Sequence, residues 1–242
     1  TLKKNAEEKI KEEGLRVLIC AGTGCVANGS LEIIEKFKER GINVQPLSKE
    51  DKMTAVPTGC HGFCEQGVLV VIPKLDVTYV KVKLDDVDEI IESHIKGGKP
   101  VERLLYIDPA TQNHVFKNED IKFYAGQTRV SLANCGEINP EAIEDTLAAG
   151  GYQALYNVLK ENNPDNVVET ITKSGLRGRG GGGFPTGRKW MFTKMAQGDK
   201  KYVVCNGDEG DPGAFMDRSV MEGDPHKLLE GMAIAGFAVG AD

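Results

Sequence analysis

The first hundred residues alternate between short apolar runs and segments with helical spacing. Apolar residues 15–19 are β-prone, whereas Ile33, Ile34 and Phe37 recur at helical intervals. A single crossover helix between the first two strands predicts a small thioredoxin-like α/β sheet. Predicted strands cover residues 15–19, 42–47, 68–72 and 77–83, and predicted helices cover residues 30–41 and 85–96.

The pattern changes after residue 98. Residues 99–120 show little periodicity and contain two prolines, which is typical of a linker. From residue 121 helical patterns dominate around a glycine-rich stretch. We therefore expect a lead-in helix over 1–14, a thioredoxin-like domain over 15–98, a linker over 99–120 and a second domain over 121–242. Within this second domain, predicted helices cover 140–149, 152–161, 188–196 and 227–240, with a β-prone segment at 167–173 and a strand at 201–205.

Composition narrows the class of protein. The chain is 40% hydrophobic and 27% charged, as in a soluble globular protein, and its net charge of -6 argues against nucleic acid as a partner. No apolar run approaches the roughly 20 residues that span a membrane, and residues 1–13 do not resemble a secretory signal. We therefore expect a cytoplasmic protein. Because the sequence begins at Thr1 and stops after an apolar helical pattern, we also expect a fragment or a processed chain.

Four of the six cysteines form two pairs beside predicted strands. Cys20 and Cys25 follow the first strand, and Cys60 and Cys64 precede the strand at 68–72. Both loops are expected at one edge of the sheet, where four thiolates can converge and glycines can let backbone N–H groups face sulfur. The alternatives are buried thiols, a disulfide, or zinc, which also takes four thiolates. Gaps of four and three residues leave room for a wider cluster.

The glycine-rich stretch 175–187 runs directly into a helical pattern. Such a stretch lets the backbone close on a phosphate, and the helix N-terminus favours the negative charge. Arg179 and Lys189 add cationic groups. The alternative is a flexible loop, and the acidic residue of a simple Rossmann site is absent at its usual distance. The residues alone therefore indicate a phosphate-bearing cofactor and no more.

An acidic loop follows the strand predicted at 201–205. Asn206, Asp208, Glu209 and Asp211 are close in sequence, so their carboxylates need a compensating partner or solvent. They could bind a metal, form a solvated turn, or accept hydrogen bonds from ribose, nicotinamide or flavin groups. The residues alone favour the solvated turn.

The cysteine spacing, with Cys60 and Cys64 in the sequence TGCHGFC, resembles that of thioredoxin-like 2Fe–2S ferredoxins. This group includes the small NAD-side subunit of respiratory complex I and related subunits of soluble hydrogenases. The resemblance covers about residues 14–98. It implies a one-electron carrier ligated by Cys20, Cys25, Cys60 and Cys64, with His61 as a loop residue or hydrogen-bond donor.

The sequences GLRGRGGGGFPTGRKW and VVCNGDEGDPG resemble the flavoprotein subunit of complex I and its relatives. The resemblance runs from about residue 121 to the end and implies the first part of a Rossmann-like FMN-binding domain, with Cys135 and Cys205 as packed thiols. Asp211 stands where the family often has Glu. The residues implied to contact FMN, NAD(H) or NADP(H) are Gly178, Arg179, Gly180, Gly183, Phe184, Lys189, Phe192, Asn206, Asp208, Glu209 and Asp211.

The resemblance also implies particular roles for these residues. The loop around Arg179 lies under FMN, Lys189 reaches the flavin phosphate and the NAD site, and the acidic loop borders the isoalloxazine and ribityl groups. Phe184 and Phe192 stack on or flank NAD. The protein itself supplies position and electrostatics, without a catalytic nucleophile or acid–base pair.

The fusion of these two domains resembles the diaphorase subunit of NAD(P)-linked multimeric hydrogenases, including electron-bifurcating FeFe hydrogenases. It implies an NAD(P)H dehydrogenase in which hydride passes to flavin and single electrons pass to iron–sulfur centres. Expected partners are the hydrogenase catalytic subunit and a small ferredoxin-type subunit, with ferredoxin as a further option. A 4Fe–4S cluster is expected only in a C-terminal part beyond this chain, so the fragment alone is expected to be inactive. The alternative is a non-enzymatic 2Fe–2S carrier or docking subunit of a formate dehydrogenase or complex I-like assembly.

Overall fold

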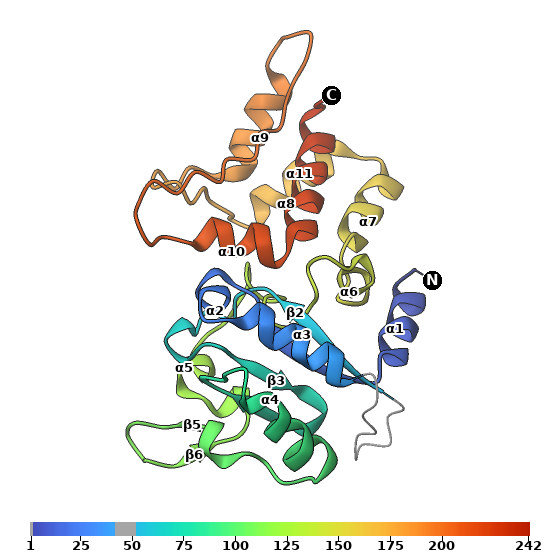
Figure 1. Cartoon of the computed structure of the whole chain (residues 1–242). Helices are drawn as coiled ribbons and strands as arrows, with labels where there is room; N and C mark the ends of the chain where they lie inside the picture. Colours follow the sequence, from blue (N-terminus) through green and yellow to red (C-terminus); the bar gives the residue numbers. More distant parts are fainter. Residues whose placement is uncertain (1, 42–51) are drawn as a thin grey trace. The chain divides into compact units, whose positions relative to one another are not determined.

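The computed structural model describes residues 2–41 and 52–242. The chain divides into two compact units (Figure 1). The first comprises residues 1–149 and 215–225, and the second comprises residues 150–214 and 226–242. None of the helices within the described ranges is both long and apolar enough to cross a membrane.

A four-stranded sheet forms the centre of the first unit. Its strands are β1 (Leu15–Cys20), β2 (Met53–Thr58), β3 (Val70–Ile72) and β4 (Val77–Tyr79), in the order β2-β1-β3-β4. β1 and β2 are parallel, whereas β3 is antiparallel to both β1 and β4. The loops that follow β1 and β2 therefore leave the same edge of the sheet.

Helices and short turns surround this sheet, with α3 lying along β1 and β2 (Figure 1). The helices of the first unit are α1 (Leu2–Glu12), α2 (Thr23–Ala27), α3 (Ser30–Gly41), α4 (Asp86–Glu89), α5 (Lys122–Ala125), α6 (Ile143–Ala148) and α10 (Met216–Gly223). A π-helical segment (Ile90–Lys96) extends α4. A hairpin is formed by β5 (Tyr106–Ile107) and β6 (His114–Val115), and 3-10 turns cover Cys64–Gln66, Pro73–Leu75, Glu102–Leu104 and Asn118–Asp120.

One apolar core joins the sheet to these helices. Ile19 of β1, Phe37 of α3, Tyr79 of β4 and Ile91 of the π-helical segment have no exposed surface. Burying each side chain of this size stabilises the fold by roughly 1.5–3 kcal/mol. The hydrophobic pattern of the sequence therefore predicts this part of the fold, and the thioredoxin-like α/β class is confirmed.

Two predicted elements of the first unit need comment. The strand predicted at residues 42–47 lies outside the described residues. The strand β2 was not predicted because its sequence, MTAVPT, contains Pro57. Proline is tolerated there because β2 is the last strand of the sheet among the described residues, so a missing N–H donor on its outer side disrupts no ladder in this part of the chain.

Residues 99–120, for which the sequence predicts a linker, contribute to the core. Val101, Leu104 and Leu105 are buried in it, and the Val101 N–H donates to the Tyr79 hydroxyl at 3.0 Å. This hydrogen bond and the three buried apolar side chains hold the segment against the sheet.

The first unit extends as far as Ala149 because ion pairs hold α6 against α1 and β1. The buried Asp145 carboxylate accepts from Arg16 Nη2 at 2.5 Å and from the Asn139 N–H at 2.7 Å. Lys9 of α1 pairs with Glu144 at 2.7 Å. The first compact unit therefore ends at Ala149 and not at residue 121, where the sequence pattern changes.

The second unit consists of four helices and long loops. The helices are α7 (Gln153–Glu161), α8 (Pro164–Lys173), α9 (Thr186–Met195) and α11 (Pro225–Val239). The prediction of a β-prone segment at 167–173 was wrong, because Asn163 caps α8 by accepting from the Asn166 N–H and Pro164 occupies the first turn. The strand predicted at 201–205 is also absent: no strand in the described part of the chain pairs with it, and Val204 is 81% exposed.

Candidate functional site

The parallel pairing of β1 and β2 brings the two cysteine pairs together. Cys20 is the last residue of β1 and lies opposite Thr58, the last residue of β2. Cys25 lies in α2, directly after β1, while Cys60 and Cys64 lie in the loop after β2. The four cysteines thus come from the last residue of β1 and from the segments that follow β1 and β2 at the same end of the sheet.

Glycines allow these two loops to approach closely. A Cβ at Gly22 would lie 2.7 Å from the Cys60 Cβ, and one at Gly67 would lie 2.7 Å from the Cys25 Sγ. Any side chain at either position would push the loops apart. The sequence analysis did not identify Gly67. Its position three residues after Cys64 is the feature from which it could have been predicted.

The cysteine sulfurs interact with one another and with backbone N–H groups. Cys60 Sγ lies 3.7 Å from Cys64 Sγ and accepts from the Gly62 N–H at 3.3 Å. A hydrogen bond between the thiols of Cys20 and Cys25 raises the pKa of Cys20 to about 11 and lowers the pKa of Cys25. Backbone hydrogen bonds from His61 and Leu69 favour the thiolates of Cys20 and Cys25, respectively.

The two pairs differ in exposure. Cys20 and Cys25 are buried, Cys60 is half-buried and Cys64 is exposed, and none of them forms a disulfide. Among the residues that the structure describes, no three His, Cys, Asp or Glu side chains are placed so that they could hold a single metal ion. Four thiols with amide donors around them nevertheless match the donor set of an all-cysteine iron–sulfur cluster.

His61 lies between Cys60 and Cys64 in the sequence, but its side chain forms a contact away from the sulfurs. Its ring is buried, and Nε2 lies 3.0 Å from the Thr58 hydroxyl. Burial, with a smaller effect of the Arg129 charge, lowers the pKa of His61 to about 4. The neutral ring therefore holds the loop against the end of β2.

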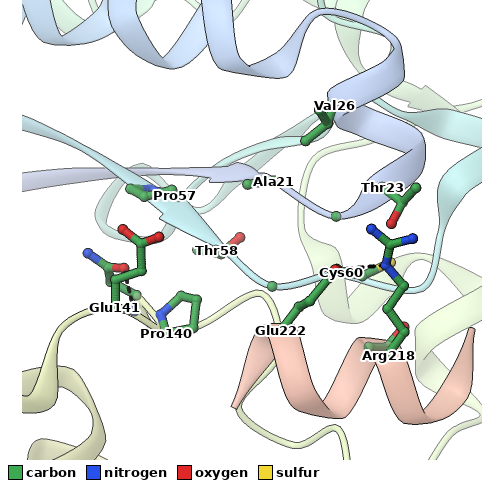
Figure 2. A pocket seen from close by; sticks show the side chains of 14 residues that line it. Ala21, Thr23, Val26, Pro57, Thr58, Cys60, Pro140, Glu141, Arg218 and Glu222 are labelled. Carbon is green, nitrogen blue, oxygen red and sulfur yellow. Dashed lines mark hydrogen bonds and ion pairs between the residues drawn. The ribbon is translucent and has the colours of Figure 1, made fainter. Parts of the chain in front are cut away.

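A cavity of about 430 Å³ borders Cys60 within the first unit. Figure 2 shows Arg218 of α10 extending toward Thr23 and Cys60, and Arg218 Nε donates to Glu222 at 2.7 Å. The end of α10 lies against the cysteine loop, since a Cβ at Gly59 would lie 2.5 Å from the Gly223 Cα. Sequence analysis did not anticipate this contact, because the two glycines are far apart in the chain.

The glycine-rich loop of the second unit is a hairpin closed at its base. The Gly178 N–H donates to the Phe184 carbonyl, and the Thr186 N–H donates to the Leu176 carbonyl, each at 2.9 Å. Nothing lies within 4 Å of a Cβ placed at Gly180 or Gly183, so the tip is open. This leaves bare backbone in front of α9, as a phosphate cradle requires.

Only some of the residues around this loop lie close to one another. The rings of Phe184 and Phe192 lie 6.4 Å apart, and the Arg188 guanidinium lies 5.8 Å from the Phe192 ring centre. Arg179 and Lys189 are exposed. The predicted flavin residues therefore lie on an open surface of this unit.

The acidic loop is equally open. Asn206, Asp208 and Asp211 are exposed and Glu209 is half-buried, and the Asp208 N–H donates to the Asn206 side chain at 2.9 Å. This local bond forms a polar turn. Cys205 is exposed rather than packed, whereas Cys135 is buried as expected.

Comparison with protein families identifies both regions. Residues 8–94 match the family of thioredoxin-like 2Fe-2S ferredoxins, and residues 171–242 match the Nuo51 FMN-binding domain. The chain therefore joins a thioredoxin-like 2Fe–2S ferredoxin domain to the start of a Nuo51 FMN-binding domain. This confirms the resemblance found in the sequence.

Several curated relatives of the chain are subunits of hydrogenases or quinone oxidoreductases. It is 55% identical over 115 residues to the NADP-reducing hydrogenase subunit HndC of Solidesulfovibrio fructosivorans (48% of this chain, 23% of the relative). It is 56% identical over 95 residues to an NADH-quinone oxidoreductase subunit of Rhizobium meliloti strain 1021 (39% and 23%). It is 29% identical over 236 residues to the NAD-reducing hydrogenase HoxS subunit alpha of Cupriavidus necator (93% and 35%).

The chain is homologous to these subunits of hydrogenases and NADH-quinone oxidoreductases, but spans only 23–35% of their length. Among solved structures, the thioredoxin-like 2Fe-2S ferredoxin of Aquifex aeolicus is 37% identical, with 38% of this chain and 89% of that chain covered and a TM-score of 0.34. An NAD+-reducing NiFe hydrogenase in the air-oxidized state is 23% identical, with 94% and 36% covered and a TM-score of 0.39.

Proposed function

We propose that this chain is part of the NAD(P)H oxidoreductase module of a hydrogenase complex. It would contribute a 2Fe–2S electron carrier and the first part of a site for FMN and NAD(P)(H). Its homology to hydrogenase and NADH-quinone oxidoreductase subunits supports this class of reaction. The observation that carries the proposal is the convergence of four cysteines from the loops after β1 and β2.

Cys20, Cys25, Cys60 and Cys64 are the proposed ligands. The close approach of backbone at Gly22 supports a compact cluster rather than a set of separate thiols. Amide N–H groups near the sulfurs stabilise negative charge there, which favours ligation by thiolates. Electrons would enter or leave on the side of Cys60 and Cys64, because this pair is the more exposed one.

The second unit would bind the flavin phosphate and the nicotinamide nucleotide. The open backbone of residues 178–183 would close on phosphate, with Arg179 and Lys189 supplying positive charge. Phe184 and Phe192, whose rings are neighbours, would flank the nicotinamide, and residues 206–211 would accept hydrogen bonds from the flavin or the ribose. FMN, when bound, would supply the step from two-electron hydride chemistry to single-electron transfer.

Cofactor analysis of the anaerobically purified chain tests this proposal. Iron, sulfide, zinc and flavin are quantified, and electron paramagnetic resonance is recorded after reduction. We expect about two irons and two sulfides per chain with a 2Fe–2S signal. Zinc without sulfide would refute the electron-carrier function.

An alternative function is that of a non-enzymatic carrier or docking subunit. The exposure of the proposed flavin residues favours this alternative, since two of the four cysteines are buried within their own unit whereas the tip of the glycine-rich loop is open. Flavin measurements on the native complex separate the two functions. Flavin that co-purifies and is reduced by NADH or NADPH supports the oxidoreductase, and a complex with iron–sulfur clusters but no flavin supports the carrier.

A further inference from the structure

A cavity of about 610 Å³ lies beside β3 and β4 in the first unit. Val71 of β3 and Thr78 of β4 are paired neighbours in the sheet, and both line this cavity. Successive side chains of a strand point to opposite faces of a sheet, and the residues that flank Thr78, Val77 and Tyr79, belong to the apolar core. Thr78 therefore points away from that core and toward the cavity.

The remainder of the polar lining comes mainly from the segment 118–137. Asn118, Tyr124 and Arg129 of this segment line the cavity and are half-buried. The segment lies outside residues 8–94, which match the ferredoxin family. The cavity is therefore formed jointly by the ferredoxin domain and by residues that follow it in the chain.

Three of the residues that line the cavity carry buried side-chain oxygens without a hydrogen-bond partner in the part of the chain that the structure describes. These oxygens are Thr78 Oγ1, Asn118 Oδ1 and Tyr124 Oη, and Thr78 as a whole is only 1% exposed. Burying a polar group without a partner is unfavourable, so folded proteins nearly always supply one. Three such oxygens around one cavity indicate that a polar ligand completes their hydrogen bonds.

Arg129 supplies a half-buried positive charge to the same cavity. Its Nη2 donates to the Cys135 carbonyl at 3.3 Å, and within residues 2–41 and 52–242 no carboxylate pairs with its guanidinium. A guanidinium forms its strongest hydrogen bonds with carboxylate and phosphate oxygens. The charge of Arg129 therefore favours a ligand with an oxyanion group.

The acidic side chains that line the cavity leave this preference intact. Glu119 and Glu137 are exposed to solvent, which screens their charges. Asp76 is paired with Lys117. The half-buried charge of the lining is therefore positive.

We propose that this cavity binds a small organic oxyanion, a carboxylate or a phosphate monoester, that also carries a hydrogen-bond donor. Arg129 pairs with the oxyanion, the hydroxyls of Thr78 and Tyr124 rotate to donate to it, and the donor of the ligand satisfies Asn118 Oδ1. The volume lies within the roughly 300–1,000 Å³ of small-molecule sites. Neither a cysteine nor a residue of the glycine-rich loop is among the described residues that line the cavity, so this inference goes beyond the proposed function.

Isothermal titration calorimetry of the full chain tests the proposal with three probes that share one carbon skeleton: glycerate, glycerol 3-phosphate and glycerol. We expect saturable binding of at least one of the two anions and none of glycerol, because the guanidinium requires an oxyanion. Tighter binding of glycerate identifies a carboxylate ligand, and tighter binding of glycerol 3-phosphate identifies a phosphate monoester. Absence of binding by both anions would overturn the proposal.

Substitutions show where the bound anion lies. Arg129→Gln should weaken its binding about tenfold, because the charge-assisted hydrogen bonds are lost. Thr78→Val, which keeps the shape of the side chain but removes its hydroxyl, should weaken binding several-fold. Arg179→Gln is the matched control, since Arg179 is an exposed cation of the glycine-rich loop in the second unit. Binding that weakens in Arg179→Gln but not in Arg129→Gln would place the anion at that loop and overturn the proposal.

Hydrogen exchange on the wild-type chain covers the case in which a variant does not fold. The anion that binds more tightly should slow amide exchange in peptides that span residues 76–80 and 118–133, because it links β4 to the segment across the cavity. Unchanged exchange in these peptides, or protection confined to residues 175–187, would overturn the proposal.

Discussion

The two units of this protein build their candidate sites in different ways. In the first unit, a sheet with a continuous buried core sets the positions of the cysteine loops. In the second, the buried apolar side chains are few, namely Val167, Val168, Ala238 and Val239, and the proposed flavin residues lie on open loops. The first site is thus organised by its own unit, whereas the second presents residues on a surface that other groups would have to cover.

The comparison shows how glycine serves two purposes. Near the cysteines, Gly22 is needed because another backbone lies against it. At the tip of the glycine-rich hairpin, Gly180 faces open space, so its lack of a side chain leaves room for a ligand. Substitutions at glycines of the two kinds should therefore have different consequences.

The largest effect is expected from removing a cysteine ligand. Cys64→Ala should reduce iron and sulfide content more than tenfold, because an iron loses one of its thiolates and alanine offers no ligand atom in its place. Cys205→Ala is the matched control, since Cys205 is also exposed but lies in the second unit. Equal iron content in the two variants would contradict the assignment of Cys64.

A smaller effect, on the stability of the second unit, is expected from a substitution where α8 packs against α9. A Cβ at Gly187 would lie 2.1 Å from the Thr172 Oγ1 and 2.6 Å from its Cα, so Gly187→Ala forces the helices apart. Overpacking of this kind costs about 1–3 kcal/mol of unfolding free energy. Urea unfolding followed by the fluorescence of Trp190, the single tryptophan, measures it.

Gly182→Ala is the control for this change, because its Cβ would meet nothing within 4 Å. The visible spectrum of the iron–sulfur cluster should be the same in both variants. A loss of cluster in Gly187→Ala would show that the two units do not fold independently.

A several-fold loss of cluster occupancy is expected from Gly22→Ala. Its Cβ would lie 2.7 Å from the Cys60 Cβ and 3.2 Å from the Cys60 Sγ, which displaces one loop from the other. Gly24→Ala, in the same loop, would place its Cβ at an ordinary 3.7 Å from Cys64 and should retain the cluster. Iron content after reconstitution measures both, and similar occupancy would mean that the close approach is not required.

The smallest effect is a dependence of stability on pH. Burial lowers the pKa of His94, so the folded first unit binds this proton less readily than the unfolded chain. Its contribution to stability is therefore complete above the unfolded pKa of about 6.5 and is lost progressively as the pH falls below that value. His94→Gln should flatten the decline in unfolding free energy between about pH 7 and pH 5.

Far-ultraviolet circular dichroism during urea unfolding measures this slope. The Trp190 transition reports on the second unit and should keep the same pH dependence in both proteins. An unchanged slope for the first unit would mean that His94 does not contribute.

Much of the fold could be predicted because its signals are local. Ile33, Ile34 and Phe37 show the spacing of a helix, and α3 covers Ser30–Gly41 as predicted. The strand β2 was missed because Pro57 suits only an edge position, which sequence does not reveal. The strand predicted at 201–205 failed for a related reason, since an apolar run becomes a strand only where a partner strand is present.

The sequence by itself determined which residues carry the chemistry: two cysteine pairs, a glycine-rich stretch and an acidic loop, each recognisable from residue type and spacing. Only the tertiary structure decided that Gly22 and Gly67 lie against the cysteines and that Gly59 lies against Gly223. These contacts join residues that are distant in the chain. Burial and close approach depend on the three-dimensional path of the backbone, which residue spacing along the chain does not specify.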